Sequence, residues 1–328
     1  MPNQRRTLLA STAAAAAVAF LSLPLPARAQ AFPSRTITFV VPAAPGGILD
    51  QSARLVAGEL TKILGQPVIV ENRAGASQII GAQYVARAEP DGYTLLMGSI
   101  GPNAAHYGIY SKLPYKPEDF TGVAHVISMP NVLLVNPSLP ANSVAELVAL
   151  AKAKPGQVVL ASSGTATSGH LGAELLEMRA GIDLNHVPYK GSTPALTDLI
   201  GGNAQVMVDN LVTAGPQIRA GRVRALAVTG PQRVPTFPDI PTIAESGYPG
   251  FDVQVWVGFM APGRTPPAVV NTLHAEIGKV LALPHVRQRI AEMGGTSLPM
   301  TPAEFSAYVR AEIEKWGQVA KSANIRAD

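Results

Sequence analysis

Strand-like and helix-like segments alternate along most of the chain, and this alternation limits its possible folds more than any other feature. The apolar, β-branched run at 36–41 is typical of a strand buried on both faces. Four further segments follow in the order helix, strand, helix, strand, at 48–64, 67–72, 79–88 and 92–99. The order β-α-β-α-β predicts a parallel sheet with right-handed crossovers.

The same pattern returns in the second half of the chain. Helical segments are predicted at 143–153, 170–181 and 193–202, and strands at 157–164, 184–191, 204–210 and 223–230. Two more helices follow, one at 265–282 and one that begins at Thr301. Ser143 with Glu146, and Thr301 with Glu304, have the spacing of capping boxes, which marks where two of these helices begin.

Two long apolar stretches, at 124–138 and 251–263, do not fit a simple count of strand and helix pairs. A chain that crosses twice between two lobes would contain such stretches, and an extra antiparallel pair on one sheet is the alternative. We favour two lobes. The first combines residues 32–129 with 252–328, and the second is 130–251.

The first 29 residues have the layout of an export signal. An arginine pair at 5–6 precedes an alanine-rich apolar run, and small-x-small patterns that end at residues 29 and 31 are typical of cleavage sites. A membrane anchor would need about 20 strongly apolar residues. We therefore expect a signal at 1–29, cleaved there or at 31, and a periplasmic protein. The arginine pair leaves the Sec and twin-arginine routes open.

Charge and composition exclude several functions. The formal net charge of +4 falls to +1 without the signal, because three arginines and no acid are lost (4 − 3 = 1). With no basic stripe, nucleic acid is an unexpected partner. The absence of cysteine excludes disulfides and thiol nucleophiles, and the six histidines lack metal-ligand spacing. We expect no metal and no cofactor.

Two strand-to-helix turns are the best candidates for a binding site. The first contains Pro45, Gly46 and Gly47 and runs into Ile48 and Asp50, and the second spans Ser162–Ser168. The N–H groups in the first turn of a helix lack intrahelical partners and carry part of the helix dipole, so such a turn suits a small anion. Asp50 is predicted to order the first loop by accepting nearby backbone N–H groups.

The chain resembles the Bug-type extracytoplasmic solute receptors. These are the substrate-binding proteins of tripartite tricarboxylate transporters. The similar segments follow the same order as in that family and extend over nearly the whole chain after the predicted signal. The similar segments include "VVPAAPGGILD", "DGYTLLMGS", "HVPYKGSTPALTDLIGG" and "FPDIPTIAESGYPGF". So many segments in sequence are far more specific than one motif.

The resemblance implies a type II periplasmic-binding-protein fold, in which two doubly wound α/β lobes are joined by two crossing strands. It implies a monomer without catalysis that closes on a small carboxylate and delivers it to membrane transporter subunits. Together with the two turns, it selects these ligand-binding residues: Pro45, Gly46, Gly47, Ile48, Asp50, Ser99, Ser163, Gly164, Thr165, Ser168, His170 and Asp209.

The sequence departs from the family pattern in two places. Ile48 and Leu49 stand where small polar residues are usual, and "AGASQII" at 74–80 replaces a more glycine-rich stretch. If these side chains face the cleft, they favour an aromatic or branched monocarboxylate over an aspartate- or citrate-like ligand. The sequence does not decide whether Ile48 and Leu49 face inward.

Two other functions remain open at this point. An exported hydrolase or lyase could use Ser163 or Ser168 with His170, but no orienting acid stands nearby and the G-x-S-x-G pattern fails because Ala166 replaces its first glycine. A receptor that feeds a signalling partner would share the same cleft.

Overall fold

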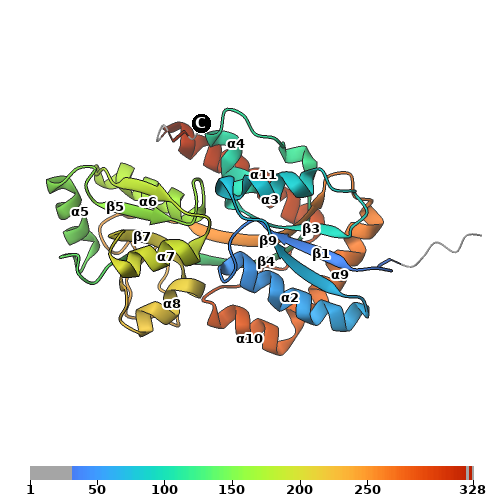
Figure 1. Ribbon diagram of the computed structural model, residues 1–328. Helices are drawn as coiled ribbons and strands as arrows, with labels where there is room; N and C mark the ends of the chain where they lie inside the picture. Colours follow the sequence, from blue (N-terminus) through green and yellow to red (C-terminus); the bar gives the residue numbers. More distant parts are fainter. Residues whose placement is uncertain (1–31, 323–324, 327–328) are drawn as a thin grey trace, which may run out of the picture. The chain divides into compact units, whose positions relative to one another are not determined.

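The computed structural model describes residues 32–322 and 325–326 (Figure 1). The export signal predicted at 1–29 lies outside the described residues. Within the described ranges, no helix combines the length and the apolar character needed to cross a membrane. The compact unit that begins at Arg35 contains all the strands and helices described below.

Five strands form the first sheet, in the order β2-β1-β3-β9-β4. β1 (Ile37–Val41), β2 (Val68–Asn72) and β3 (Thr94–Ser99) are parallel to one another. β9 (Gln254–Pro262) runs antiparallel to β3 and to β4 (Phe120–Val135). The side chains of β1 are almost all buried, as predicted for a strand that is covered on both faces.

The second sheet shares β4 with the first. β5 (Val159–Ser162) is parallel to β6 (Asn185–Pro188) and to β7 (Val206–Asn210). β4 runs antiparallel to β7 and to β8 (Arg224–Val228). The carboxyl ends of the parallel strands β5, β6 and β7 therefore lie at one edge of this sheet.

The 16-residue strand β4 carries the chain from one sheet to the other. Its part up to Pro130 pairs with β9, and its part from Asn131 onward pairs with β7 and β8. The chain returns just before β9, where the Val253 N–H donates to the Thr229 carbonyl at 2.9 Å. The predicted lobe boundaries stay a prediction.

Helices cover both faces of the first sheet. In Figure 1, α3 and α11 lie on one side of it, and α2, α9 and α10 lie on the other. Their bounds are Ile48–Leu64 for α2, Ile79–Ala86 for α3, Pro267–Ala282 for α9, Pro284–Glu292 for α10 and Pro302–Ser322 for α11. The last helix has a core face, since Phe305 and Trp316 are fully buried.

The second sheet has helices on both sides as well. α6 (Ser168–Ala180) lies on one side, and α7 (Ser192–Gly201) and α8 (Leu211–Arg219) lie on the other (Figure 1). α5 (Val144–Ala153) precedes β5. As predicted, Ser143 caps α5, because its Oγ accepts the Glu146 N–H at 3.2 Å.

Several elements were not predicted from the sequence. α8 contains Pro216, which interrupts the helical pattern. α10 has only two buried residues, Val286 and Ile290, too few for a clear apolar stripe. A π-helical turn (Gly101–Ala105) leads into the short helix α4 (His106–Ile109) after β3.

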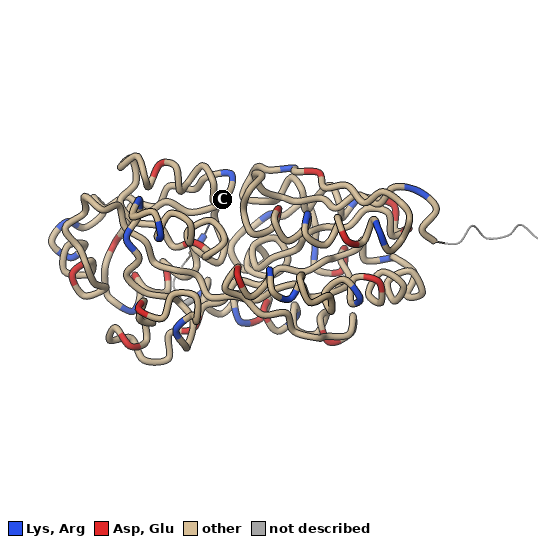
Figure 2. The backbone as a smooth tube through the Cα atoms, turned by 90° about the horizontal axis from the view of Figure 1, so that it is seen from below, with Lys and Arg blue, Asp and Glu red and all other residues tan. Residues whose placement is uncertain are grey.

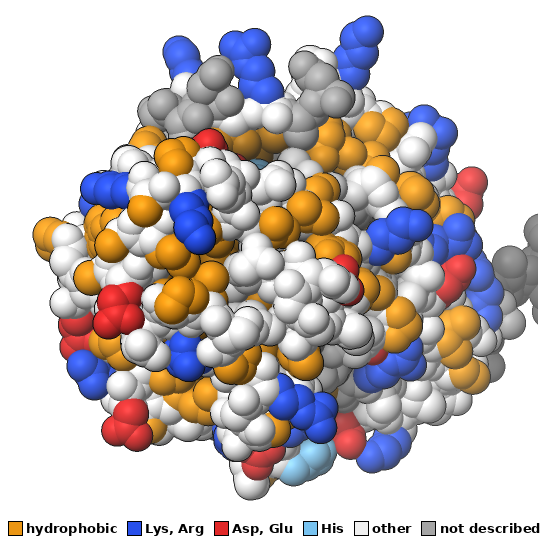
Figure 3. Space-filling model, turned by 60° about the vertical axis from the view of Figure 1, so that its left-hand side comes forward, with side chains coloured by type: hydrophobic (Ala, Val, Ile, Leu, Met, Phe, Trp, Pro, Cys, Tyr) orange, Lys and Arg blue, Asp and Glu red, His pale blue; other side chains and the backbone are white. Residues whose placement is uncertain are grey.

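Charged side chains do not gather by sign. Figure 2 shows Lys and Arg interspersed with Asp and Glu along the described chain. On the face drawn in Figure 3, hydrophobic side chains lie in small groups among polar ones. The interspersed charges agree with the absence of a basic stripe in the sequence.

One glycine sets how closely α6 packs on β7. A Cβ added to Gly169 would lie 2.1 Å from the Val208 carbonyl oxygen, whereas one added to Gly172 would meet its nearest neighbour at 3.6 Å. Gly169→Ala should therefore force the helix away from the strand and lower the free energy of unfolding by about 1–3 kcal/mol. Gly172→Ala is the matched control and should be neutral or raise the free energy of unfolding by up to about 1 kcal/mol. Urea unfolding measures both, and equal losses would contradict this account.

Candidate functional site

Helix α2 begins without a capping side chain. Its N-cap is Gly47, which has extended backbone angles (φ −79°, ψ 177°). The N–H groups of Ile48 and Leu49 therefore have no partner within the helix, and they carry the positive end of its dipole. This is the first turn that the sequence predicted.

Helix α6 begins in the same way after β5. Its N-cap, Thr167, is extended (φ −75°, ψ 162°) and does not cap the helix with its side chain. Its Oγ1 donates instead to the Gly164 carbonyl at 2.8 Å. The first-turn N–H groups of Ser168 and Gly169 therefore remain available to a ligand.

A third helix start without a capping side chain belongs to α7, a helix that was predicted from the sequence but not as part of the binding site. The N-cap of α7 is Gly191, and no side chain caps this helix. By contrast, Asn210 caps α8, because its Oδ1 accepts two first-turn N–H groups. Three of the N-caps without a capping side chain, Gly47, Thr167 and Gly191, line one cavity.

This cavity is narrow and contains no Lys or Arg in its described lining. Its volume is about 30 Å³, which is close to the share of one molecule in liquid water. Six predicted site residues line it: Gly47, Ile48, Ser99, Ser163, Ser168 and Asp209. The other six do not: Pro45, Gly46, Asp50, Gly164, Thr165 and His170. That any of the twelve contacts a ligand stays a prediction.

Several residues that line the cavity were not selected from the sequence. The polar ones are Gln78, Thr167, Ser192 and Asn210, and the larger apolar ones are Leu49, Ile100 and Val255. Gly191 and Pro194, which stand on either side of Ser192, are the sequence signal for the start of α7. Ile48 and Leu49 both line the cavity, which settles a question that the sequence left open.

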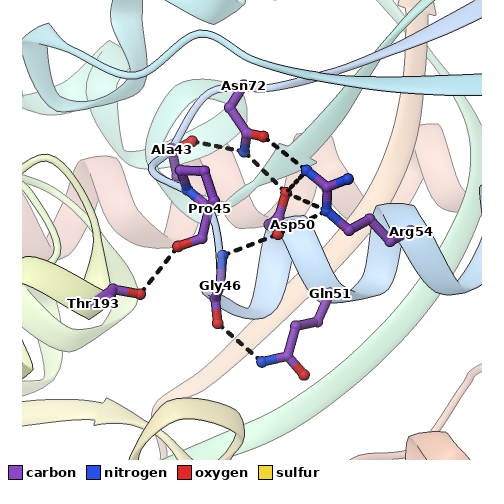
Figure 4. A network of polar contacts seen from close by, with 8 residues as sticks. All are labelled: Ala43, Pro45, Gly46, Asp50, Gln51, Arg54, Asn72 and Thr193. Carbon is purple, nitrogen blue, oxygen red and sulfur yellow. Dashed lines mark hydrogen bonds and ion pairs between the residues drawn. The ribbon is translucent and has the colours of Figure 1, made fainter.

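Asp50 holds the first loop from behind (Figure 4). Its Oδ2 accepts the Gly46 N–H at 2.9 Å, and its Oδ1 accepts the Asn72 amide at 3.0 Å. Arg54 donates to both oxygens at 3.0 Å. Burial alone would raise the pKa of Asp50, but the hydrogen bonds from Arg54, Gly46 and Asn72 lower it below its usual value. The predicted ordering role of this carboxylate is what the structure shows.

Two stacked histidines hold the second turn from behind. His170 Nδ1 accepts the N–H of Ala166, a residue in the left-handed region (φ 61°), at 3.1 Å. The Nε2 of His170 lies 3.1 Å from Glu174 Oε1. His186 stacks on His170 with ring centroids 3.9 Å apart, and its Nε2 lies 2.7 Å from Ser162 Oγ. The residues thus fix the turn without reaching the cavity.

Asp209 is a buried acid in the cavity wall. Its Oδ1 accepts from Ser192 Oγ at 2.7 Å and from the Asn210 amide at 3.0 Å, and its Oδ2 accepts from Thr213 Oγ1 at 2.5 Å. Burial raises the pKa of Asp209 to about 6, although these hydrogen bonds oppose the increase. The wall therefore presents a carboxyl group in a place where an anion would find no cation.

Hydrogen bonds join the elements of the two sheets across the cavity. They are Ala44 N to the Lys190 carbonyl (3.1 Å), Thr193 Oγ1 to the Pro45 carbonyl (3.1 Å) and Thr165 N to Ser77 Oγ (3.0 Å). A Cβ on Gly191 would lie only 3.1 Å from the Ala44 nitrogen, so glycine allows this close approach. These contacts hold the elements of the two sheets close together beside the cavity.

Residues 52–325 match the family described as "Tripartite tricarboxylate transporter family receptor". The chain belongs to this receptor family.

Solved structures of similar proteins agree with this assignment. Rpa4515 of R. palustris, solved with adipate, is 38% identical with a TM-score of 0.87, and the match covers 90% of this chain and 99% of that one. The periplasmic binding protein BugD is 35% identical with a TM-score of 0.86, covering 90% and 100%. MatC of Rhodopseudomonas palustris, solved with bound malate, is 36% identical with a TM-score of 0.85, covering 88% and 99%.

The predicted resemblance to Bug-type receptors and the predicted two-lobed α/β fold are therefore confirmed. The family is one of receptors, so this receptor is a solute-binding protein and not a hydrolase. The geometry agrees, because Ala166 and Glu174 occupy the two ring nitrogens of His170. Neither Ser163 nor Ser168 has this histidine as a base.

The histidine support makes the receptor sensitive to acid. Burial, and after it the neighbouring His170, lowers the pKa of His186 from 6.5 to about 3. Between these values the unfolded chain binds a proton that the folded receptor does not bind, so stability falls as pH falls below 6.5.

His186→Gln keeps a polar group near Ser162 but does not titrate. The free energy of unfolding should therefore fall by roughly 1–3 kcal/mol less in this variant than in the wild type between pH 7 and pH 4.5. Urea unfolding at the two pH values measures the difference. An unchanged pH dependence in His186→Gln would show that His186 is not the group responsible.

Proposed function

We propose that this receptor captures a small carboxylate in the periplasm and delivers it to the membrane subunits of a tripartite tricarboxylate-type transporter. One observation carries the proposal. Three helices begin without a side-chain cap, and their N-caps line one cavity whose described lining contains no Lys or Arg. Such a site binds an anion through N–H and hydroxyl donors and the positive ends of helix dipoles.

The proposed ligand lies between two lobes, residues 32–129 with 252–328 and residues 130–251. With this division, each of the three hydrogen bonds across the cavity joins one lobe to the other. A ligand that contacts both lobes has a higher affinity for the closed form than for an open one, and this difference drives closure.

The lining narrows the class of carboxylate. Ile48 and Leu49 line the cavity together with Ile100 and Val255, so much of a bound molecule would contact hydrocarbon. A second negative charge would meet no cation, and Asp209 would repel it when ionised. Relatives are solved with adipate and malate, which supports a carboxylate. The apolar lining supports a branched or aromatic monocarboxylate for this chain.

A periplasmic location rests on the layout of residues 1–29 and on the family. The arginine pair, the apolar run and the small-x-small patterns are those of a cleaved export signal. BugD, 35% identical to this chain, is described as a periplasmic binding protein. The transporter partner is proposed from the description of the family alone.

A panel of carboxylates tests the proposal. The receptor is melted at pH 7.5 with 4-methylpentanoate, benzoate, aspartate, citrate and a neutral sugar. The first two should raise the melting temperature with increasing concentration, and at 100 times the dissociation constant the stabilisation should be about 2.7 kcal/mol. Native mass spectrometry of freshly purified receptor should show a retained small acid. No response to any carboxylate, or a response to the sugar alone, would reject the function.

Gly47 offers a way to block the cavity without damage to the fold. A Cβ added there meets nothing within 4 Å, and its backbone angles suit any residue. Gly47→Val should fill the space beside the first-turn amides and abolish the response to every carboxylate in the panel. Gly58→Val, on α2 but away from the cavity, is the control, because a Cβ at Gly58 also meets nothing within 4 Å. Isothermal titration measures both, and normal affinity in Gly47→Val would exclude this turn as the site.

A further inference from the structure

Three successive residues ahead of α3 have a left-handed backbone, and none of them is glycine. The φ angles are 43° at Ala76, 49° at Ser77 and 79° at Gln78. Non-glycine residues adopt this conformation rarely, and they persist in it where the surroundings hold them. The segment thus has a strained conformation at the edge of the cavity, which is where strain is most often functional.

The strained turn directs two side chains. Ser77 Oγ accepts the Thr165 N–H from the other side of the cavity at 3.0 Å. Gln78 lines the cavity and is only 7% exposed. Its Oε1 accepts from Ser99 Oγ at 2.9 Å. Its Nε2 carries two N–H groups and donates to no group in the described part of the chain, so these donors can serve a ligand.

A donor that lines the cavity and has no partner in the protein can bind a ligand that supplies an acceptor. The nature of that acceptor follows from the charges around it. The cavity lining includes Asp209 and no cation, so a second carboxylate would be desolvated without compensation. A neutral carbonyl oxygen accepts the same hydrogen bond without that penalty.

The geometry points to Gln78 as a specificity-determining residue. It would select carboxylates whose apolar body carries one neutral hydrogen-bond acceptor, such as a ketone oxygen, in addition to the carboxylate at the helix starts. This inference rests on the proposed function, because it assigns the second polar contact of the same ligand.

Three molecules of nearly equal shape separate the effects. In 4-methylpentanoate, the fourth carbon carries two methyl groups. In 4-oxopentanoate, a ketone oxygen replaces one of these methyl groups. In succinate, oxygen atoms replace both methyl groups, so the fourth carbon belongs to a second carboxylate. Isothermal titration at pH 7.5 measures each with the full receptor. The wild type should bind 4-oxopentanoate about tenfold more tightly than 4-methylpentanoate, as one good hydrogen bond allows, and succinate most weakly.

Gln78→Met removes the amide and keeps the length of the side chain. This variant should lose the preference for 4-oxopentanoate. It should bind 4-methylpentanoate more tightly than it binds 4-oxopentanoate. Gln83→Met, at a partly buried glutamine of the following helix α3 that does not line the cavity, is the matched control and should keep the wild-type order. Circular dichroism melting of both variants checks that the fold is retained.

Each alternative result has a distinct meaning. If Gln78→Met weakens all three ligands equally, Gln78 binds the shared carboxylate and the inference is overturned. It is also overturned if the wild type prefers 4-methylpentanoate or succinate to 4-oxopentanoate. If none of the three acids, nor benzoate, binds the wild type, the proposed function itself fails. Binding of benzoate with an unchanged order in Gln78→Met rejects only the role of Gln78.

Discussion

The first-turn N–H groups of α2, α6 and α7 have no partners within their helices, and the arrangement of the site depends on them. A helix leaves these donors unsatisfied unless a side chain caps it. In α5 and α8, Ser143 and Asn210 do so. At Gly47, Thr167 and Gly191 no side chain does, and all three N-caps line one cavity. Because the helices follow parallel strands, their starts lie at the carboxyl edges of the sheets, where ligands of open α/β folds bind.

The groups that hold these turns lie outside the cavity. Asp50 fixes the first loop through Gly46, and His170 fixes the second through Ala166. Both contacts replace bonds that a mobile loop would make to water. Asp50 and His170 do not line the cavity, so these titratable groups position the backbone of the two turns without occupying the cavity wall. Asp209 is the exception, since it lines the cavity, and burial keeps its pKa near 6.

The alternation of strands and helices was sufficient to predict the parallel strands, the two crossing stretches and the first two turns of the site. It was sufficient for the helix α7 but not for the place of its start in the cavity, because a glycine before a helix, such as Gly191, has many uses other than binding. Gln78 could not be predicted from the sequence at all. Its place in the cavity depends on a left-handed backbone at Ala76–Gln78, which propensities argue against for all three residues. Tertiary contacts, such as that of Ser77 with Thr165, override local preference there.

The helix starts and the side chains of the cavity wall differ in how well they can distinguish one ligand from another. Backbone N–H groups are the same in every protein, so the three helix starts can attract an anion without distinguishing the rest of the molecule. In the proposed function, selection among carboxylates would come from the side chains of the cavity wall, chiefly Ile48, Leu49 and Gln78. The same turn that places Gln78 also bonds across the cavity through Ser77. One short segment therefore contributes both to the cavity wall and to the contacts between the elements of the two sheets.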